Sequence, residues 1–469
     1  MAGTLRIAPL LIASFTVKLL VLAWMYSLDP ERIVAGDTAS YENPAHVLIS
    51  TGRFSASLEE PSRIETLRTP GYPAFIAAIF FVLPDSRLAV AIGQIAISTA
   101  TLGLVYVVAA QLWNASTAIA AAALLSLDLL SFVYAPLLQS ETLFAFAIVV
   151  TAWAGVTLLG AASPRGVPSA APGGPPELGW LRWALLFGAA AASATLIRPI
   201  AYYLFLPSLG AILLHGLVNK QSIRRLTAVG LVAALPWILL VEGWRLRNYL
   251  VAGRAEIAQI AAVNLLWYRG AGIVAERDHI SFWDARDRIA RSLPDTTGWS
   301  PGAVSALYER EGLRLIAGYP GLFLRMQVYG LLKVLAGPGR ADLLHYFAGV
   351  PYEDAPEGVV GLSATQLRQR FESDRPLVLI ALIYATAYLI ALYVCVSFGV
   401  WGVVRTERTL LASHAFVWWV IIYLVMLAAG PEAYARFRVP VMPLLALYAG
   451  RGLKEVLPFV RQRDERRRA

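Results

Sequence analysis

Charged residues are scarce in this chain of 469 residues, where Asp, Glu, Lys and Arg make up only 15%. Ordinary soluble proteins carry roughly a quarter. Hydrophobic residues reach 58% and mean hydropathy is +0.60. A soluble fold could not bury that much apolar surface, so the composition excludes a soluble globular protein and predicts one that lies in a membrane.

Cysteine, histidine and nucleotide-binding motifs are equally sparse. The single cysteine, Cys395, excludes an intrachain disulfide and a Cys-rich metal site. The five histidines are scattered without the paired spacing of metal ligands. There is no Walker-type phosphate loop and no dinucleotide fingerprint. Redox chemistry and a cytosolic nucleotide donor are therefore not expected.

Long apolar runs dominate what is present. Stretches of about 18 to 25 residues can cross a hydrocarbon core of roughly 30 Å as helices, and an isolated span must be helical to satisfy its own backbone. Ten runs lie near residues 7–28, 88–112, 115–136, 141–161, 180–197, 199–216, 226–243, 377–404, 411–430 and 436–453. The sequence predicts an all-α polytopic membrane protein with about ten transmembrane helices.

Two further apolar pieces are expected to be juxtamembrane or re-entrant helices. Residues 71–83 are too few to cross a bilayer, which takes about 20. Residues 321–337 carry Arg325, Gln327 and Lys333, which suit an interface better than lipid. Counting either piece as a span would reverse the orientation of everything after it.

Basic residues set the expected orientation. The net charge is +9, and the excess lies mainly in short connections and in the C-terminal tail. Ten crossings place these segments on one side, which the positive-inside rule assigns to the cytoplasm. We therefore expect a multi-pass cell (inner) membrane protein with both termini cytoplasmic and the site on the periplasmic or extracellular side.

This threading gives two large external loops, residues 29–87 and 244–376. Four units are expected. Residues 1–254 form an N-terminal transmembrane module with the first external loop, and residues 255–376 form an external region with an interfacial helix. Residues 377–455 form the C-terminal transmembrane helices, and residues 456–469 form a basic cytoplasmic tail.

Several ionisable side chains then fall near the external surface. Asp37 follows the first span closely, and Tyr41 lies four residues later, on the same face of a helix. Arg68 precedes two prolines and could clamp a phosphate. Glu141 opens a span, whereas Asp128 lies within one, where an ionisable group is usually functional. The alternatives are a helix cap for Asp37, a snorkelling anchor for Arg68 and a helix-dipole partner for Glu141.

More arginines from distant segments are expected on the same face. They are Arg198, Arg245, Arg247 with the adjacent Asn248, Arg436 and Arg438. Five arginines converging beside two acids would suit a site that neutralises a lipid-linked phosphate and activates a hydroxyl group. Asp37 together with Glu141 could also hold a divalent metal ion, the one cofactor that the sequence leaves open.

The order of these motifs is similar to that of a known family. From about residue 7 to 455, the series GDTASY…AHVL, RTPGYP, SETLF, LIRP, PW…RNY and RFRVPVMP resembles bacterial GT-C glycosyltransferases. The branch is the one with protein O-mannosyltransferases and lipid A aminoarabinose transferases. Two residues depart from the pattern: Phe437 stands where relatives often have Tyr, and Asp128 where Pro or an apolar residue is expected.

The resemblance implies a GT-C-like fold and a glycosyltransferase. Such enzymes move a sugar from a polyprenyl-phosphate carrier to an acceptor hydroxyl at the external face, usually with inversion. Asp37 would be the general base or would position the acceptor, and Glu141 would match the second acid. The implied substrate-binding residues are Tyr41, Arg68, Arg198, Arg247, Asn248, Arg436 and Arg438. The expected partners are the donor, a lipid, glycan or protein acceptor, and membrane lipids, with no nucleic acid.

Two other functions remain open. A lipid-linked glycan flippase or transporter would also need external arginines, but should show polar residues deep in several helices and internal symmetry. A polysaccharide polymerase or ligase would use similar donors and should have a late loop rich in Arg and His. The late loop here has the arginines but only two histidines, His279 and His345.

Overall fold

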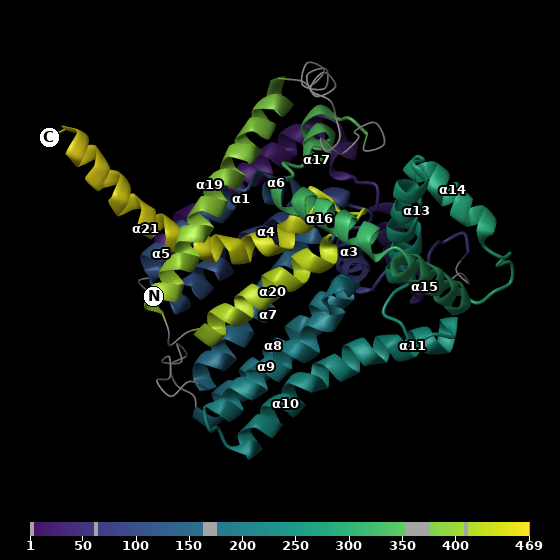
Figure 1. Ribbon diagram of the computed structural model, residues 1–469, viewed down its shortest axis with the longest axis horizontal. Helices are drawn as coiled ribbons and strands as arrows, with labels where there is room; N and C mark the ends of the chain where they lie inside the picture. Colours follow the sequence, from purple (N-terminus) through teal and green to yellow (C-terminus); the bar gives the residue numbers. More distant parts are fainter. Residues whose placement is uncertain (1–3, 61–63, 163–175, 352–375, 408–410, 469) are drawn as a thin grey trace.

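The computed structural model describes residues 4–60, 64–162, 176–351, 376–407 and 411–468. These residues are almost entirely helical (Figure 1), and no strand occurs among them apart from one isolated antiparallel bridge between Ser55 and Ile64. The predicted all-α fold is confirmed.

Eight helical segments of the described chain are long and apolar enough to cross a membrane. They comprise α1 (Thr4–Leu28), α4 (Arg87–Leu112), α7 (Glu141–Ala162), α8 (Pro176–Ile197), η2 (Pro199–Leu204) with α9 (Phe205–Val218), α10 (Ile223–Trp237) with η3 (Ile238–Glu242) and α11 (Gly243–Ala252), α19 (Pro376–Thr406), and α20 (Leu411–Ala428). Each coincides with an expected span, so the chain is a membrane protein with many helical spans.

The other two expected spans are irregular. Residues 115–136 form two short helices, α5 (Ala115–Ser126) and α6 (Leu129–Tyr134). The break comes at Asp128, whose carboxylate caps α6 by accepting a hydrogen bond from the backbone N–H of Ser131. The last expected span consists of a 3₁₀ turn, η8 (Ala435–Val441), and the buried start of α21 (Met442–Arg468). That these two segments cross the membrane stays a prediction.

Close helix packing relies on small residues. A side chain at Gly399 of α19 would collide with the carbonyl of Tyr448 in α21, and one at Gly452 would collide with the carbonyl of Cys395. Figure 1 shows α19 and α21 side by side. Because lipid is as apolar as a helix surface, helices in membranes associate through close contact of this kind.

The polar segments expected outside the membrane form two groups of short helices. The first contains η1 (Pro30–Ile33), α2 (Ala39–Thr51) and α3 (Gly71–Val82). The second contains α12 (Ile260–Asn264), η4 (Leu265–Gly270), α13 (Ala271–Asp278), α14 (Phe282–Ser292), α15 (Pro301–Gly318), α16 (Pro320–Ala336), α17 (Arg340–Leu343) and η5 (Leu344–Ala348). In Figure 1, α13, α14 and α15 lie at the end of the molecule far from both termini. The helices α3 and α16 occur where juxtamembrane pieces were predicted, and neither is among the eight candidate spans.

A small cavity of about 30 Å³, lined by both polar and apolar side chains, lies between helices of the bundle. Lys18 of α1 lines it and donates a hydrogen bond to the hydroxyl of Ser98 in α4 at 2.9 Å. Asp128, at the break between α5 and α6, lines the same cavity. Both charged residues are at least 95% buried, and within the described chain they form no direct ion pair with each other.

Candidate active site

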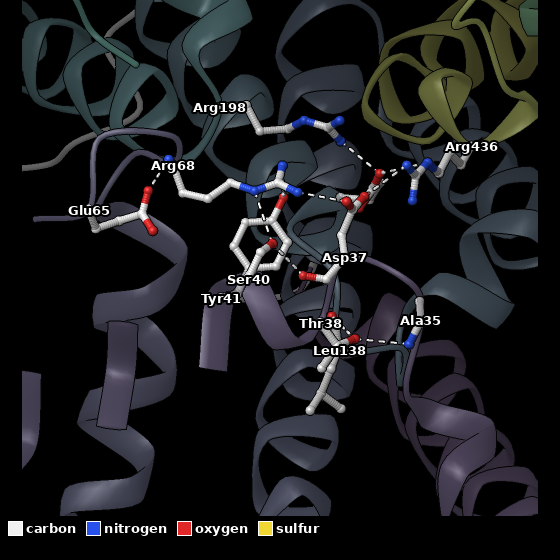
Figure 2. Close-up of polar contacts among 11 residues, drawn as sticks. Ala35, Asp37, Thr38, Ser40, Tyr41, Glu65, Arg68, Leu138, Arg198 and Arg436 are labelled. Carbon is white, nitrogen blue, oxygen red and sulfur yellow. Dashed lines mark hydrogen bonds and ion pairs between the residues drawn. The ribbon is translucent and has the colours of Figure 1, made fainter. Parts of the chain in front are cut away.

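Asp37 lies in the turn between η1 and α2, and its neighbour Thr38 fixes that turn. The Thr38 hydroxyl accepts a hydrogen bond from the backbone N–H of Ala35 at 2.9 Å and donates one to the carbonyl of Leu138 at 3.0 Å. The turn is thereby tied to the segment just before α7 (Figure 2). The residue at the N-cap position of α2 is Thr38, and its side chain makes no capping hydrogen bond. The carboxylate of Asp37 contacts arginines instead, so the capping alternative for Asp37 is wrong.

Arg68 reaches Asp37 from the turn that precedes α3. Its Nη2 lies 2.6 Å from Oδ1 of Asp37, and its Nε donates to the hydroxyl of Ser40 at 3.0 Å. The guanidinium also lies over the Tyr41 ring, 4.7 Å from the ring centroid, and donates to its hydroxyl at 3.3 Å. Figure 2 shows Arg68 extended over Tyr41 toward Asp37. Arg68 therefore contacts both of the other predicted residues, Asp37 and Tyr41, and its role in binding a phosphate stays a prediction.

Arg436, from η8, binds the other oxygen of Asp37. Its Nη2 lies 3.0 Å from Oδ2 of Asp37, and its Nε lies 3.8 Å from Oε1 of Glu141. Arg198, at the end of α8, contacts the same Glu141 oxygen at 2.8 Å. The ring of Phe437 lies within 5.5 Å of both guanidinium groups. The residue that departs from the family pattern thus packs against two arginines of the site.

The two acids, Asp37 and Glu141, lie in different environments. Asp37 keeps 33% of its side chain exposed, whereas Glu141 keeps 1%. Burial alone would favour protonation of Asp37, but the guanidinium groups of Arg436 and Arg68 outweigh it and hold its pKa at about 2. Three guanidinium groups contact these two carboxylates. Guanidinium groups are strong hydrogen-bond donors to anions such as carboxylate and phosphate.

Three predicted residues and Arg245 do not join this cluster. Arg247 donates to the carbonyls of Glu65 and Phe54, at 2.8 and 2.9 Å. Asn248 donates to the carbonyls of Glu256 and Ile257. Arg245 binds the Glu242 carboxylate and the carbonyl of Ala255. Arg438 donates to the carbonyls of Val334, Leu335 and Gly337. The expected convergence of five arginines is therefore wrong, because backbone carbonyls, and for Arg245 also the Glu242 carboxylate, occupy these groups. A substrate contact for Arg247, Asn248 or Arg438 stays a prediction.

Other polar residues near the site had not been singled out from the sequence. Glu65 is 5% exposed and accepts hydrogen bonds from the backbone N–H groups of Leu67 and Arg68, and burial raises the pKa of its carboxyl. Asp342 accepts a hydrogen bond of 2.5 Å from the hydroxyl of Tyr134, and both residues act electrostatically on Arg436. The spacing Glu65-x-x-Arg68 is a weak signal of a local turn. Nothing in the sequence pairs Tyr134 with Asp342.

A metal ion fits these residues poorly. Asp37 and Glu141 both contact guanidinium groups, which compete for the oxygens that a cation would need. Among the described residues, no group of three or more His, Cys, Asp or Glu side chains could hold a metal. We therefore assign no step to a metal ion.

Comparisons with known proteins agree with this fold. The family model for dolichyl-phosphate-mannose-protein mannosyltransferases matches residues 67–171. The apo structure of the Archaeoglobus fulgidus oligosaccharyltransferase has a TM-score of 0.51 at 13% identity, covering 97% of this chain and 51% of that one. This chain thus spans about half the length of that relative. No curated protein sequence matches the chain.

Two structures of lipid-phosphate complexes are also similar, at TM-scores below 0.5. One is the archaeal oligosaccharyltransferase AglB from A. fulgidus with an inhibitory peptide and a dolichol-phosphate, with a TM-score of 0.49 at 13% identity, covering 97% of this chain and 51% of that one. The other is ArnT from Cupriavidus metallidurans bound to undecaprenyl phosphate, with a TM-score of 0.38 at 13% identity, covering 94% of this chain and 77% of that one.

The family match and the shared fold confirm the predicted resemblance to the GT-C glycosyltransferases. The fold alone fixes no substrate, because one fold can serve several chemistries.

Proposed function

We propose that this protein is a membrane glycosyltransferase that moves a sugar from a polyprenyl-phosphate-linked donor to an acceptor hydroxyl at the external membrane face. The observation that carries the proposal is the contact of one partly exposed carboxylate, Asp37, with Arg68 and Arg436. A third arginine, Arg198, contacts the neighbouring Glu141. The family model, named for enzymes with a lipid-phosphate sugar donor, supports the donor class.

The arginines would serve the leaving group. When the bond between the anomeric carbon and the phosphate oxygen breaks, both electrons stay with the phosphate, whose new negative charge must be stabilised. Arg68 and Arg436 are the guanidinium groups nearest to Asp37, at 2.6 and 3.0 Å. Guanidinium groups bind phosphate through paired hydrogen bonds. They can therefore hold the phosphate before and after the bond breaks.

Asp37 would serve the acceptor. It takes the proton of the acceptor hydroxyl while that oxygen forms the new bond to the anomeric carbon. Attack on the face opposite the departing phosphate gives an inverted product without a covalent intermediate on the enzyme. Glu141 is too buried to meet an acceptor. Its contacts with Arg198 and Arg436 suit it to positioning these arginines.

Transfer of labelled sugar tests this function. Membranes with wild-type protein or Asp37→Asn at matched levels would receive polyprenyl-phosphate sugars labelled in the sugar. We expect transfer by wild type and a loss of at least about 100-fold in Asp37→Asn, the usual size of a general-base contribution. Glu31→Gln, an exposed acid paired with Arg87, is the matched control. Equal transfer by Asp37→Asn would show that Asp37 is not the base.

A lipid-linked glycan transporter is the second candidate, and one observation favours it. Lys18 and Asp128 lie at a cavity inside the bundle, where charges often mark transport pathways. The two functions differ in their product, because a transporter moves an intact labelled donor between leaflets and forms no new glycosidic bond.

A further inference from the structure

The geometry of Asp37 conflicts with its proposed work as a base. Each of its oxygens is bound by a different arginine, Oδ1 by Arg68 at 2.6 Å and Oδ2 by Arg436 at 3.0 Å. A carboxylate that is paired on both oxygens attracts a further proton weakly, as its low pKa indicates. An efficient base has a pKa closer to the working pH.

The phosphate of the donor needs the same guanidinium groups. Arg68 also contacts Ser40 and Tyr41, and Arg436 also approaches Glu141. Each of the two arginines binds Asp37 through its Nη2 atom. The side chain of Arg68 is 15% exposed and that of Arg436 is 20% exposed. The exposed part of these two side chains is where a ligand anion would approach. Glu141, at 1% exposure, is much less accessible to exchange.

We propose that the donor phosphate displaces the Asp37 carboxylate from Arg68 and Arg436, and thereby releases Asp37 to act as the base. This inference rests on the proposed function. In the resting protein Asp37 occupies the anion site. Donor binding replaces the carboxylate by a phosphate as the partner of the same two guanidinium groups. Asp37 then faces the acceptor hydroxyl with its oxygens free.

The exchange also imposes an order on the substrates. Before the donor binds, Asp37 is held by its arginines and is a poor base toward any hydroxyl, water included. After the donor binds, the freed carboxylate stands beside the phosphate whose sugar is to be transferred. The acceptor can therefore be deprotonated only when the donor is present.

Binding of a phosphodiester probe tests the displacement without turnover. The probe is a short-chain polyprenyl methyl phosphate, which carries a single negative charge like the donor and contains no sugar. Purified full-length protein in nanodiscs would be titrated while tryptophan fluorescence is followed. If Asp37 competes with the phosphate, Asp37→Asn should bind the probe about tenfold more tightly than wild type, roughly the effect of one charge-assisted hydrogen bond.

Three sets of variants complete the comparison. Asp37→Ser, which removes the carboxylate in a second way, should also tighten binding if Asp37→Asn folds poorly. Arg68→Gln and Arg436→Gln should weaken binding at least tenfold. Glu31→Gln, which contacts Arg87 and none of these groups, should bind like wild type.

The outcomes separate this inference from the proposed function. Tighter binding by both Asp37 variants, together with lost sugar transfer, supports displacement, because affinity and turnover then move in opposite directions. Binding that needs both arginines but is unchanged or weaker in the Asp37 variants overturns displacement and leaves the glycosyltransferase proposal intact. Absence of probe binding in every variant overturns both.

Discussion

Glu141 illustrates how much depends on a single charged partner. The structure places it at 1% exposure, with Arg198 at 2.8 Å and Arg436 at 3.8 Å. Replacing Arg198 by Gln should leave a buried carboxylate underpaired and destabilise the protein by about 3 kcal/mol. Arg198→Gln with Glu141→Gln should recover most of that loss. Thermal unfolding in detergent measures both, with Arg310→Gln, in an exposed pair with Glu311, as a control expected to change little. A fully additive double variant would contradict the pairing.

Asp37 should give the stability of the protein a pH dependence in acid. Burial works against its charged form, but Arg436 and Arg68 hold the folded pKa at about 2, below the ordinary value of 3.8. Its contribution is therefore complete above about pH 5 and is lost progressively as the pH falls through about 2. The melting temperature of wild type should fall more steeply in this window than that of Asp37→Asn. Parallel curves would show that the ion pairs add no stability.

The sequence identified residues of the site, but it could not distinguish them from nearby residues of the same type. It marked Asp37 and Arg436 because each lies near the expected external end of a span, and Arg68 because it precedes two prolines and a short apolar helix. It could not distinguish Arg436 from Arg438, which share one short motif. The first contacts Asp37, whereas the second is 1% exposed and binds three carbonyls. The difference depends on the local turn of η8, which hydropathy does not report.

At the scale of elements, Arg247 connects α11 to the first polar segment, the part of the chain between α2 and α3 that contains Phe54 and Glu65. It donates to the carbonyls of Phe54 and Glu65 and stacks on Trp244, 4.7 Å from the ring centroid. Arg247→Met should release this segment and speed tryptic cleavage after the exposed Arg53 several-fold, because its backbone loses two charge-assisted hydrogen bonds.

Arg245→Met is the matched control for that change. Arg245 lies two residues away on the same helix but binds Glu242 and the carbonyl of Ala255, outside the first segment. Its replacement should leave cleavage after Arg53 unchanged. Equal cleavage in both variants would mean that Arg247 does not anchor the segment, and a substrate contact would become the better explanation for it.

Elements were predictable where composition alone decides them. Eight expected spans appear as long apolar helices, and α3 is short, as its apolar run indicated. The run over 115–136 concealed a break, because Asp128 ends one helix and caps the next while the flanking residues remain apolar. A hydropathy average over the run dilutes a single acid. The capping geometry becomes evident only in three dimensions.

Across the whole bundle, the same Asp128 shares a cavity with a residue far away in the sequence. Lys18 and Asp128 line one cavity at the meeting of α1, α4 and α6, and the described chain shows no direct ion pair between them. A cavity of about 30 Å³ has room for a water molecule, through which two charges of opposite sign could compensate each other. The sequence flagged Asp128 but gave no sign of its partner, since 110 positions separate the two.

This arrangement predicts a reciprocal effect on the stability of the bundle. Lys18→Met or Asp128→Asn alone should destabilise the protein by about 3 kcal/mol, because each leaves the other charge uncompensated inside the membrane-spanning region. The double variant should be close to wild type. Ser98→Ala, which removes only the direct hydrogen-bond partner of Lys18, should cost about 1 kcal/mol. Melting temperatures in nanodiscs give all four values. If the single changes add up in the double variant, the two charges do not sense each other and the cavity does not couple them.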